Sequence, residues 1–338
     1  MKEKHEGDFV KWDLPLALAI MMSIIFTIAL FFASTIIVFY TNSTLLEIFP
    51  DYGIQDYQIT LEIKERLMPI GLIMLGITFA LIIIGFIFRR GWLSTAGTIA
   101  FYLPVFGAYS MTMFYLAGIG ILRVLWMPLI TIDPGVFELG HIVLIPKFVL
   151  FESLWTRIID NSEYRLIDGA ISNGLILLGI LIFAIGTATW FLVRLKDERV
   201  ASIGIYKYSR HPQYLGFLLW SYGILFTVAG MPVPFGGLLL TPSLPWLFGL
   251  FIILAVASQE EISMVEKYGL EYTTYRDTTP FLFPLPRQIS HILSIPIRYI
   301  FKKDRLESGR EIAVVAIFYL VILIVLSVPF AILHGVYF

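Results

Sequence analysis

The sequence predicts an all-α protein, a polytopic transmembrane helical bundle of about seven spans. Two observations lead to this prediction. The chain of 338 residues is 58% apolar and only 14% charged, whereas soluble domains contain about 25% charged residues. Several apolar runs also continue for about 18 residues or more without a charge, which is long enough to cross a hydrocarbon core about 30 Å thick.

The expected spans follow one another between polar or charged segments. The first apolar run is too long for a signal-peptide core and lacks a small-residue cleavage site, so we expect it to remain as a span. A polar loop over 41–66 follows it. The run at 141–151 contains Pro146 and Lys147 and is short, which favours a re-entrant or interfacial segment. The seven spans are expected at 14–40, 67–88, 96–122, 171–193, 212–230, 244–258 and 312–334.

The basic segments predict how the bundle is oriented. If the N-terminus lies in the cytosol, the residues Arg89-Arg90, the segment 194–210 and the segment 287–310 also lie there, as the positive-inside tendency requires. The acidic loop 41–66 then lies outside, and the chain makes an even number of crossings, most simply none, between 122 and 171. We therefore expect a multi-pass integral membrane protein.

Composition also limits the partners and the chemistry. The formal net charge of −1 gives no reason to expect nucleic acid, and the absence of cysteine excludes disulfides, thiolate metal sites and a cysteine nucleophile. No metal site is expected. We divide the chain into an N-terminal membrane region over 1–170, a core over 171–290, and a basic juxtamembrane segment with a final span over 291–338.

The chemistry is expected where the fifth and sixth spans end on one membrane face. Arg210 and His211 precede Pro212, which biases His211 towards an extended turn before a helix whose first N–H groups attract anions. Together they could bind a carboxylate. The alternative is that these basic residues only meet lipid headgroups.

The partner segment begins with Glu260-Glu261 at the end of an apolar run. Adjacent carboxylates repel, so we expect that they do not both face one partner. One of them could bind an ammonium or sulfonium cation, while the other pairs elsewhere; the alternative is a solvated helix end. Aromatic residues crowd both segments, as an interfacial belt or as a box for a cation or an adenine ring. They are Tyr206, Tyr208, Tyr214, Tyr268, Tyr272 and Tyr275.

These residues resemble the signature of the isoprenylcysteine carboxyl methyltransferase and phospholipid methyltransferase superfamily, whose members are integral membrane enzymes that use S-adenosylmethionine. The resemblance rests on the order of several short motifs between Gly174 and Pro286. These motifs are Gly204-Ile-Tyr206, Arg210-His-Pro-Gln-Tyr214 with Gly216, Glu260-Glu261-Ile-Ser, Tyr268-Gly269, Tyr272, Tyr275 and Pro280.

The resemblance implies roles for particular residues. It implies a cofactor pocket on the cytosolic face, with S-adenosylmethionine as the cofactor and a lipophilic small molecule or a lipidated substrate as the acceptor. Separately from the resemblance, we expect Glu261 or Arg210 to orient this acceptor. The cofactor-binding residues are expected to be Arg199, Val200, Ala201, Tyr206, His211, Pro212, Gln213, Tyr214 and Glu260.

One position departs from the family. Eukaryotic carboxyl methyltransferases carry a substrate-associated arginine one helical turn before the first glutamate, where this chain has Val256. An apolar residue there cannot orient a carboxylate, so this position speaks against a prenylcysteine carboxylate and leaves open a lipid amine, another lipid-borne nucleophile or a small thiol.

Two other functions compete with methyl transfer. NADPH-dependent sterol reductases share the Arg-His-Pro-x-Tyr-Leu-Gly turn, although the Glu260-Glu261-Ile-Ser run favours a methyltransferase. A transporter or a non-catalytic membrane protein is the alternative of another class. The fourth to sixth spans have no ionisable residue near their middle, where a transport pathway normally needs one.

Overall fold

A computed structural model gives the structure of this chain. It describes residues 14–37, 40, 44, 57–88, 94, 97, 121–148, 161–229, 241–303 and 305–333. Every regular element within these residues is a helix, which confirms the all-α fold class. The long helices are α1 (Leu14–Phe32), α3 (Tyr57–Ile87), α8 (Asn161–Leu195), α9 (Pro212–Val228), α10 (Ser243–Tyr268) and α13 (Gly309–Leu333).

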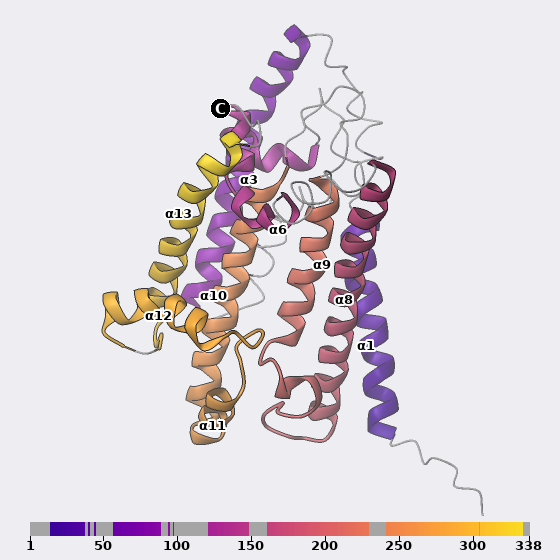
Figure 1. Cartoon of the computed structure of the whole chain (residues 1–338), viewed down its shortest axis with the longest axis vertical. Coiled ribbons are helices and arrows are strands. Elements are labelled where there is room, and N and C mark those ends of the chain that lie inside the picture. The colour runs from indigo at the N-terminus through magenta and orange to yellow at the C-terminus, as the bar shows by residue number, and fades with distance from the viewer. Residues whose placement is uncertain are drawn as a thin grey trace, which may run out of the picture.

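Five of these helices are long and apolar enough to cross a membrane, namely α1, α3, α8, α10 and α13. The chain is therefore a multi-pass membrane protein. Helix α9 has 17 residues and lies between α8 and α10 (Figure 1). The span expected at 96–122 falls almost entirely outside the described residues, as do Arg89-Arg90, so the number of seven spans stays a prediction.

Three helices are longer than the apolar runs predict. α3 begins at Tyr57, inside the segment 41–66 that was expected to be a loop. α8 begins ten residues before 171, and α10 continues beyond Glu261 to Tyr268. The thickness of the hydrocarbon core limits how long an apolar run needs to be. Leucine, glutamate and lysine remain good helix formers beyond that point, so the helix continues. α10 ends only at Gly269, whose φ of 55° lies in the left-handed region.

Short helices connect the long ones. At the upper end of Figure 1 lie a π-helical turn, η1 (Ala33–Ile37), and five short segments: η2 (Ile121–Trp126), α5 (Met127–Ile130), η3 (Pro134–Glu138), η4 (His141–Leu144) and α6 (Ile145–Lys147). The run expected to be re-entrant or interfacial thus contains η4 and α6. Lys147 in α6 is fully buried and pairs with Asp168 at 3.0 Å. The other end carries η6 (Gly204–Lys207) and α11 (Leu270–Thr278), whereas α12 (Arg287–Phe301) lies nearer the middle, beside the start of α13 (Figure 1).

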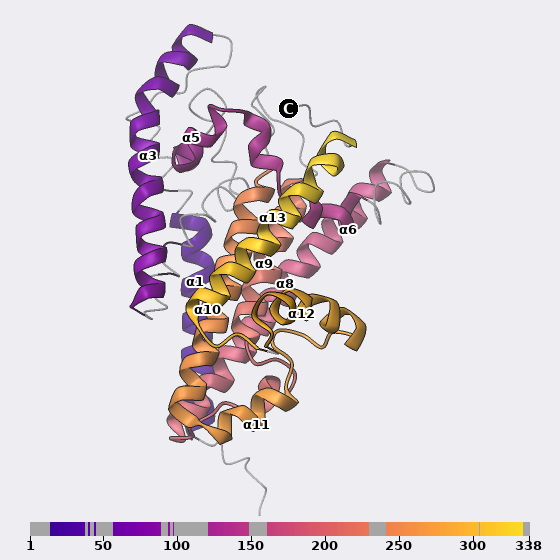
Figure 2. The same ribbon diagram turned by 90° about the vertical axis from the view of Figure 1, so that its left-hand side faces the viewer.

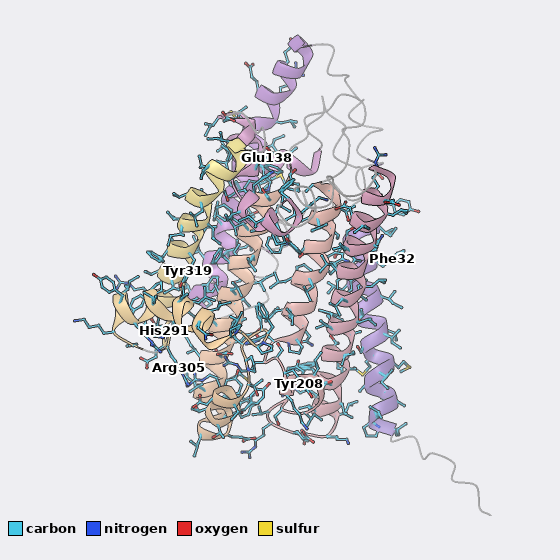
Figure 3. The ribbon with its side chains drawn as sticks, in the orientation of Figure 1. Phe32, Glu138, Tyr208, His291, Arg305 and Tyr319 are labelled. Carbon is cyan, nitrogen blue, oxygen red and sulfur yellow. The ribbon has the colours of Figure 1, made fainter. Side chains whose placement is uncertain are left out.

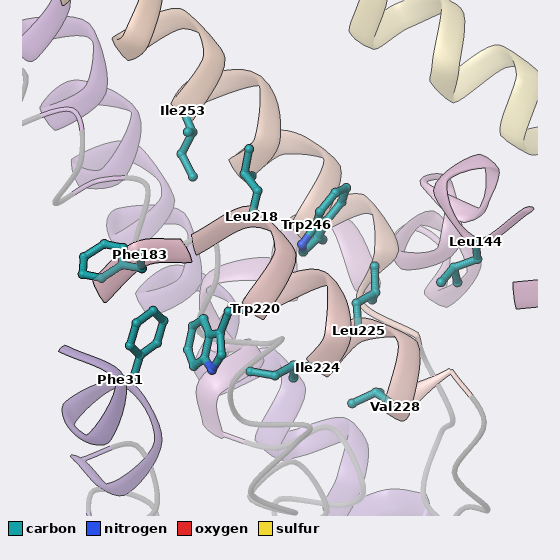
Figure 4. Close-up of a cluster of buried hydrophobic side chains, with 10 residues drawn as sticks. All are labelled: Phe31, Leu144, Phe183, Leu218, Trp220, Ile224, Leu225, Val228, Trp246 and Ile253. Atoms are coloured by element: carbon teal, nitrogen blue, oxygen red, sulfur yellow. The ribbon is translucent and has the colours of Figure 1, made fainter. Parts of the chain in front are cut away.

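Close contact between α8 and α9 fixes the middle of the bundle. A Cβ atom added at Gly216 would lie 2.5 Å from the backbone nitrogen of Phe183, so only glycine allows this approach. Around the contact, Trp220 and Phe183 both pack edge-on against Phe31 of α1, with ring centroids 4.6 and 5.1 Å apart (Figure 4). This buried cluster ties α1, α8, α9 and α10 together.

The bundle brings distant segments to one end. The start of α1, the end of α8 and helix α11 all lie at the lower end of Figure 1, and Figure 2 shows the same arrangement from the side. The 204–216 segment and the end of α10 therefore share a side, as the sequence predicts. Figure 3 places Tyr208 at this end and Glu138 at the opposite one.

Candidate active site at the ends of α8, α9 and α10

The turn that leads into α9 is held by contacts from later in the chain. The backbone N–H of Arg210 donates a hydrogen bond to the carbonyl of Pro280 at 3.0 Å, and the Tyr275 hydroxyl donates to the carbonyl of Tyr206 at 2.8 Å. Pro212 occupies the first helical position of α9, where a missing N–H costs little. The His211 side chain is therefore presented at the start of a helix.

The ends of α9 and α10 meet through charged groups. Arg210 Nη1 lies 2.7 Å from Glu261 Oε1, and His211 Nε2 lies 3.1 Å from the same oxygen. All three side chains are largely buried, with at most 13% exposed. The predicted meeting of the cationic and acidic corners of the helical hairpin is confirmed by these distances.

His211 lies between the two neighbouring glutamates. Its Nδ1 atom is 4.0 Å from Glu260 Oε2, while Nε2 faces Glu261. The Tyr214 hydroxyl donates a hydrogen bond of 2.6 Å to Glu260 Oε1. The expectation that the adjacent carboxylates do not face one partner is therefore wrong, because an imidazole ring has two nitrogens that point in different directions.

A cavity of about 860 Å³ opens beside these groups, within the range of about 300–1,000 Å³ that is usual for ligand pockets. Of the predicted site residues, Pro212 and Glu261 are not part of its lining. Pro212 packs towards Gly186 instead, and Glu261 faces Arg210 and His211. The predicted residues that line the cavity are Arg199, Val200, Ala201, Tyr206, Arg210, His211, Gln213, Tyr214 and Glu260.

The polar end of this cavity contains partly satisfied donors and neutral phenols. The Nε atom of Arg210 is buried and makes no hydrogen bond to any part of the chain that the structure describes. The Tyr206 hydroxyl donates to Gln213 Oε1 at 3.3 Å, and burial raises the pKa of Tyr206 above its ordinary value. Burial also raises the pKa of Tyr272, with a smaller contribution from the charge of Glu261. Both phenols are therefore neutral at physiological pH.

The other end of the cavity is apolar and lies deeper in the bundle. Val256 and Ile253 line it one and two helical turns before Glu260, which corresponds to about 6 and 10 Å along the axis of α10. Phe183 of α8 and Phe217 of α9 complete this part of the wall. The cavity thus runs from charged groups at the helix ends to apolar side chains inside the bundle.

The N-terminal helices contribute to the same wall. Phe26 and Leu30 of α1 line the cavity, together with Phe86 of α3. The sequence did not identify them, because apolar residues that face a cavity and apolar residues that face lipid are of the same types. The wall therefore includes residues from both sides of the boundary that we placed at 170.

Other lining residues did leave a signal in the sequence. Ser263, Met264 and Lys267 follow Glu260 at spacings of three, four and seven residues, which places them on the same helical face. Tyr272 and Tyr275 also line the cavity and belong to the aromatic residues that the sequence singled out.

Comparison with known families identifies the central stretch. Residues 172–241 match the model of the isoprenylcysteine carboxyl methyltransferase (ICMT) family, and this match covers about a fifth of the chain. The matched stretch includes most of α8, the turn with His211, and α9, and it stops before α10. The resemblance seen in the sequence is thus confirmed over these residues, where the chain is similar to membrane methyltransferases. Neither the curated proteins nor the solved structures compared with the chain include a match.

Proposed function

We propose that this protein is an integral membrane methyltransferase that moves a methyl group from S-adenosylmethionine to a lipophilic acceptor. One observation carries the proposal: a single cavity joins a cationic corner, an acidic residue and an apolar interior. Arg210 and His211 lie at one side of its polar end, and Glu260 lies close to His211. The apolar end begins one turn deeper, at Val256.

The residues at the polar end suit the charges of S-adenosylmethionine. This cofactor has a carboxylate, an ammonium group and a sulfonium group. The carboxylate would be bound by Arg210, whose buried Nε lacks a partner among the described residues, and by the N-terminus of α9, whose first N–H groups have no partner within the helix. The Glu260 carboxylate would attract one of the cationic groups, and Tyr206 offers an aromatic face for a cation or the adenine ring.

The bound cofactor would supply a methyl group on a positively charged sulfur, already activated for transfer to a nucleophile. The protein then has to align the acceptor and exclude water. Tyr214 would orient Glu260 through its hydrogen bond. Glu261 contacts Arg210 and His211 and is not part of the cavity lining, so we give it a positioning role rather than direct contact with the acceptor.

The apolar end of the cavity favours an acceptor with a hydrocarbon part. Val256 is 4% exposed and lines the cavity one turn from Glu260, so the wall there offers no cation to a carboxylate. Among the possible acceptors, this favours a lipid amine or a thiol over a prenylcysteine carboxylate. We further propose that the polar end faces the cytosol, as the distribution of basic segments in the sequence predicts.

Calorimetry on the purified full chain in lipid nanodiscs tests the cofactor. We expect S-adenosylmethionine and its demethylated product to bind, NADPH not to bind, and His211→Ala to abolish binding. The control is Tyr208→Phe, because Tyr208 lies in the same turn but is exposed and does not line the cavity. Binding of NADPH alone would instead support a reductase, and absence of binding by either compound would overturn the proposal.

Mass spectrometry of membrane lipids tests the acceptor. Lipids from cells with the wild-type chain are compared with lipids from cells with His211→Ala. With the wild-type chain we expect a product that is heavier than the acceptor lipid by one CH₂ group, roughly 14 Da. When the donor carries a labelled methyl group, only the wild-type chain should produce labelled lipid. A labelled carboxyl ester would contradict the preference drawn from Val256.

A further inference from the structure

Helix α12 (Arg287–Phe301) has an apolar face that the described part of the protein covers at Pro296 but leaves exposed on both sides of it. The apolar residues recur at the spacing of one helical face, and they are exposed even though they are large. Tyr299 is 86% exposed and Ile292 is 60% exposed. Ile289, Leu293 and Ile300 lie on the same face and are also exposed.

The opposite face of α12 is polar and basic. His291, Ser294 and Arg298 are spaced by three and four residues, and Arg298 Nη1 lies 3.1 Å from His291 Nδ1. The segment 287–310 contains six basic residues and two acidic ones, which gives a formal charge of +4 without His291. Lys302 and Arg310, which follow the helix, are both exposed.

The direction of α12 differs from that of the long helices. It lies across them beside the beginning of α13, as both ribbon views show (Figures 1 and 2). The Tyr319 hydroxyl of α13 donates a hydrogen bond of 2.7 Å to the carbonyl of Leu293, which attaches the middle of α12 to a membrane-spanning helix. Figure 3 shows His291 and Arg305 below Tyr319, at the level where α13 starts.

We propose that α12 is an in-plane helix of the membrane interface, which buries its apolar face among lipid chains and binds anionic phospholipid headgroups with its basic face. A helix with one apolar and one basic face is suited to this position. The neighbouring helix α13 is one of the five helices that are long and apolar enough to cross a membrane, so lipid would lie beside α12. The positive charge on the basic face of α12 favours a leaflet that contains negatively charged lipids. This inference does not depend on the proposed methyl transfer.

The position of α12 in the membrane interface would also affect the candidate active site. The chain runs from α11 through Pro280 and Phe281 into α12. The Phe281 ring packs edge-on against His211 with centroids 4.9 Å apart, and the carbonyl of Pro280 accepts the hydrogen bond from Arg210 N–H. Lipid contact on α12 would therefore stabilise the loop that holds the cationic corner.

The absence of cysteine allows a direct test with single spin labels. Ile292→Cys and Tyr299→Cys report on the apolar face, and Ser294→Cys is the matched position on the polar face. The labelled full chain is placed in nanodiscs of phosphatidylcholine with phosphatidylglycerol. We expect the ratio of collisions with oxygen to collisions with a water-soluble nickel complex to be several-fold higher at 292 and 299 than at 294.

Two results would overturn the proposed position. If the labels at 292 and 299 collide mainly with the nickel complex, the apolar face is in water. If they are shielded from both reagents, a protein surface covers the face instead of lipid. Using two positions on the apolar face guards against a local distortion at either one.

Lipid charge tests the second half of the proposal. We expect the ratio at 292 to fall when phosphatidylglycerol is replaced by phosphatidylcholine. The substitutions Arg298→Gln and Lys302→Gln together should produce the same fall in the presence of phosphatidylglycerol. A ratio that responds to neither change would show that the basic face does not bind anionic headgroups.

Discussion

The carboxylate of Glu261 lies 2.7 Å from the guanidinium of Arg210, so an ion pair joins the end of α10 to the start of α9. These residues are 51 positions apart in the sequence. Because both side chains are largely buried, each charge depends on the other for its stability in the folded chain.

Removing Glu261 should therefore destabilise the fold. We expect Glu261→Ala to lower the free energy of unfolding by about 3–5 kcal/mol, as is typical when one partner of a buried pair is lost. Thermal unfolding in detergent measures this effect. The control is Glu271→Gln in α11, which removes an exposed carboxylate outside the cavity lining. Equal stability of the two variants would show that the ion pair does not support the fold.

The hydrogen bond between Tyr214 and Glu260 should affect cofactor binding. Tyr214→Phe removes one donor from a half-exposed carboxylate, which is worth about 1.5 kcal/mol, or roughly a tenfold loss of affinity. Calorimetry with S-adenosylmethionine measures the loss. The control is Tyr222→Phe in the same helix. The Tyr222 hydroxyl donates a hydrogen bond to the Val143 carbonyl, away from the cavity, so its removal should leave the affinity unchanged. A similar loss in both variants would contradict the role of Tyr214.

The close contact between α8 and α9 should tolerate no side chain at Gly216. We expect Gly216→Ala to cost about 1–3 kcal/mol of stability, because the new methyl group meets the backbone nitrogen of Phe183 and the carbonyl oxygen of Gly179. Gly174→Ala on α8 is the matched variant, since nothing lies within 4 Å of its added Cβ, and it should be neutral or slightly stabilising. If unfolding curves give the same stability for both variants, this packing is ruled out.

Enlarging Val256 should separate acceptor use from cofactor binding. Val256→Phe fills the apolar end of the cavity one turn away from Glu260, at an expected cost of about 1–3 kcal/mol in stability. We expect methylation of membrane lipids to fall while the affinity for S-adenosylmethionine is retained. Parallel lipid mass spectrometry and calorimetry make the comparison. If affinity falls as much as methylation, the cavity has no separate acceptor end.

Alkaline pH should destabilise the chain through Tyr206. Its pKa is raised by burial, whereas an unfolded tyrosine ionises at a pKa of about 10. Above that pH the unfolded state releases a proton that the folded state keeps, so the free energy of unfolding decreases as pH rises. For one residue the slope is at most about 1.4 kcal/mol per pH unit.

Comparison of the wild-type chain with Tyr206→Phe isolates this effect. We expect the two chains to show the same dependence on pH between 7 and 9, and the variant to lose less stability above about pH 10. Thermal unfolding across this range measures the difference. Parallel curves at all pH values would mean that the Tyr206 hydroxyl ionises as easily in the folded chain as in the unfolded one.

The fold class, and the placement of two distant segments on one side of the bundle, follow from the order of residues alone. Long apolar runs must form helices in a membrane, because backbone groups have no other partners there. When two successive runs are helices, the residues just before the first and just after the second must lie on the same side. Chain order and helix length therefore predict that Arg210 and Glu261 lie on the same side of the bundle, but not that they touch.

The construction of that corner and the identity of its neighbours depend on how the helices pack. The helix ends of α3, α8 and α10 do not follow the apolar runs, because polar residues beyond the membrane still form helix. The sharing of His211 by both glutamates depends on side-chain orientations that spacing does not define. Phe26 and Leu30 line the cavity although they resemble their lipid-facing neighbours, since apolar residues on a membrane helix face lipid and protein alike. The packing of α1 against α8 therefore determines that these two side chains face the cavity and not lipid.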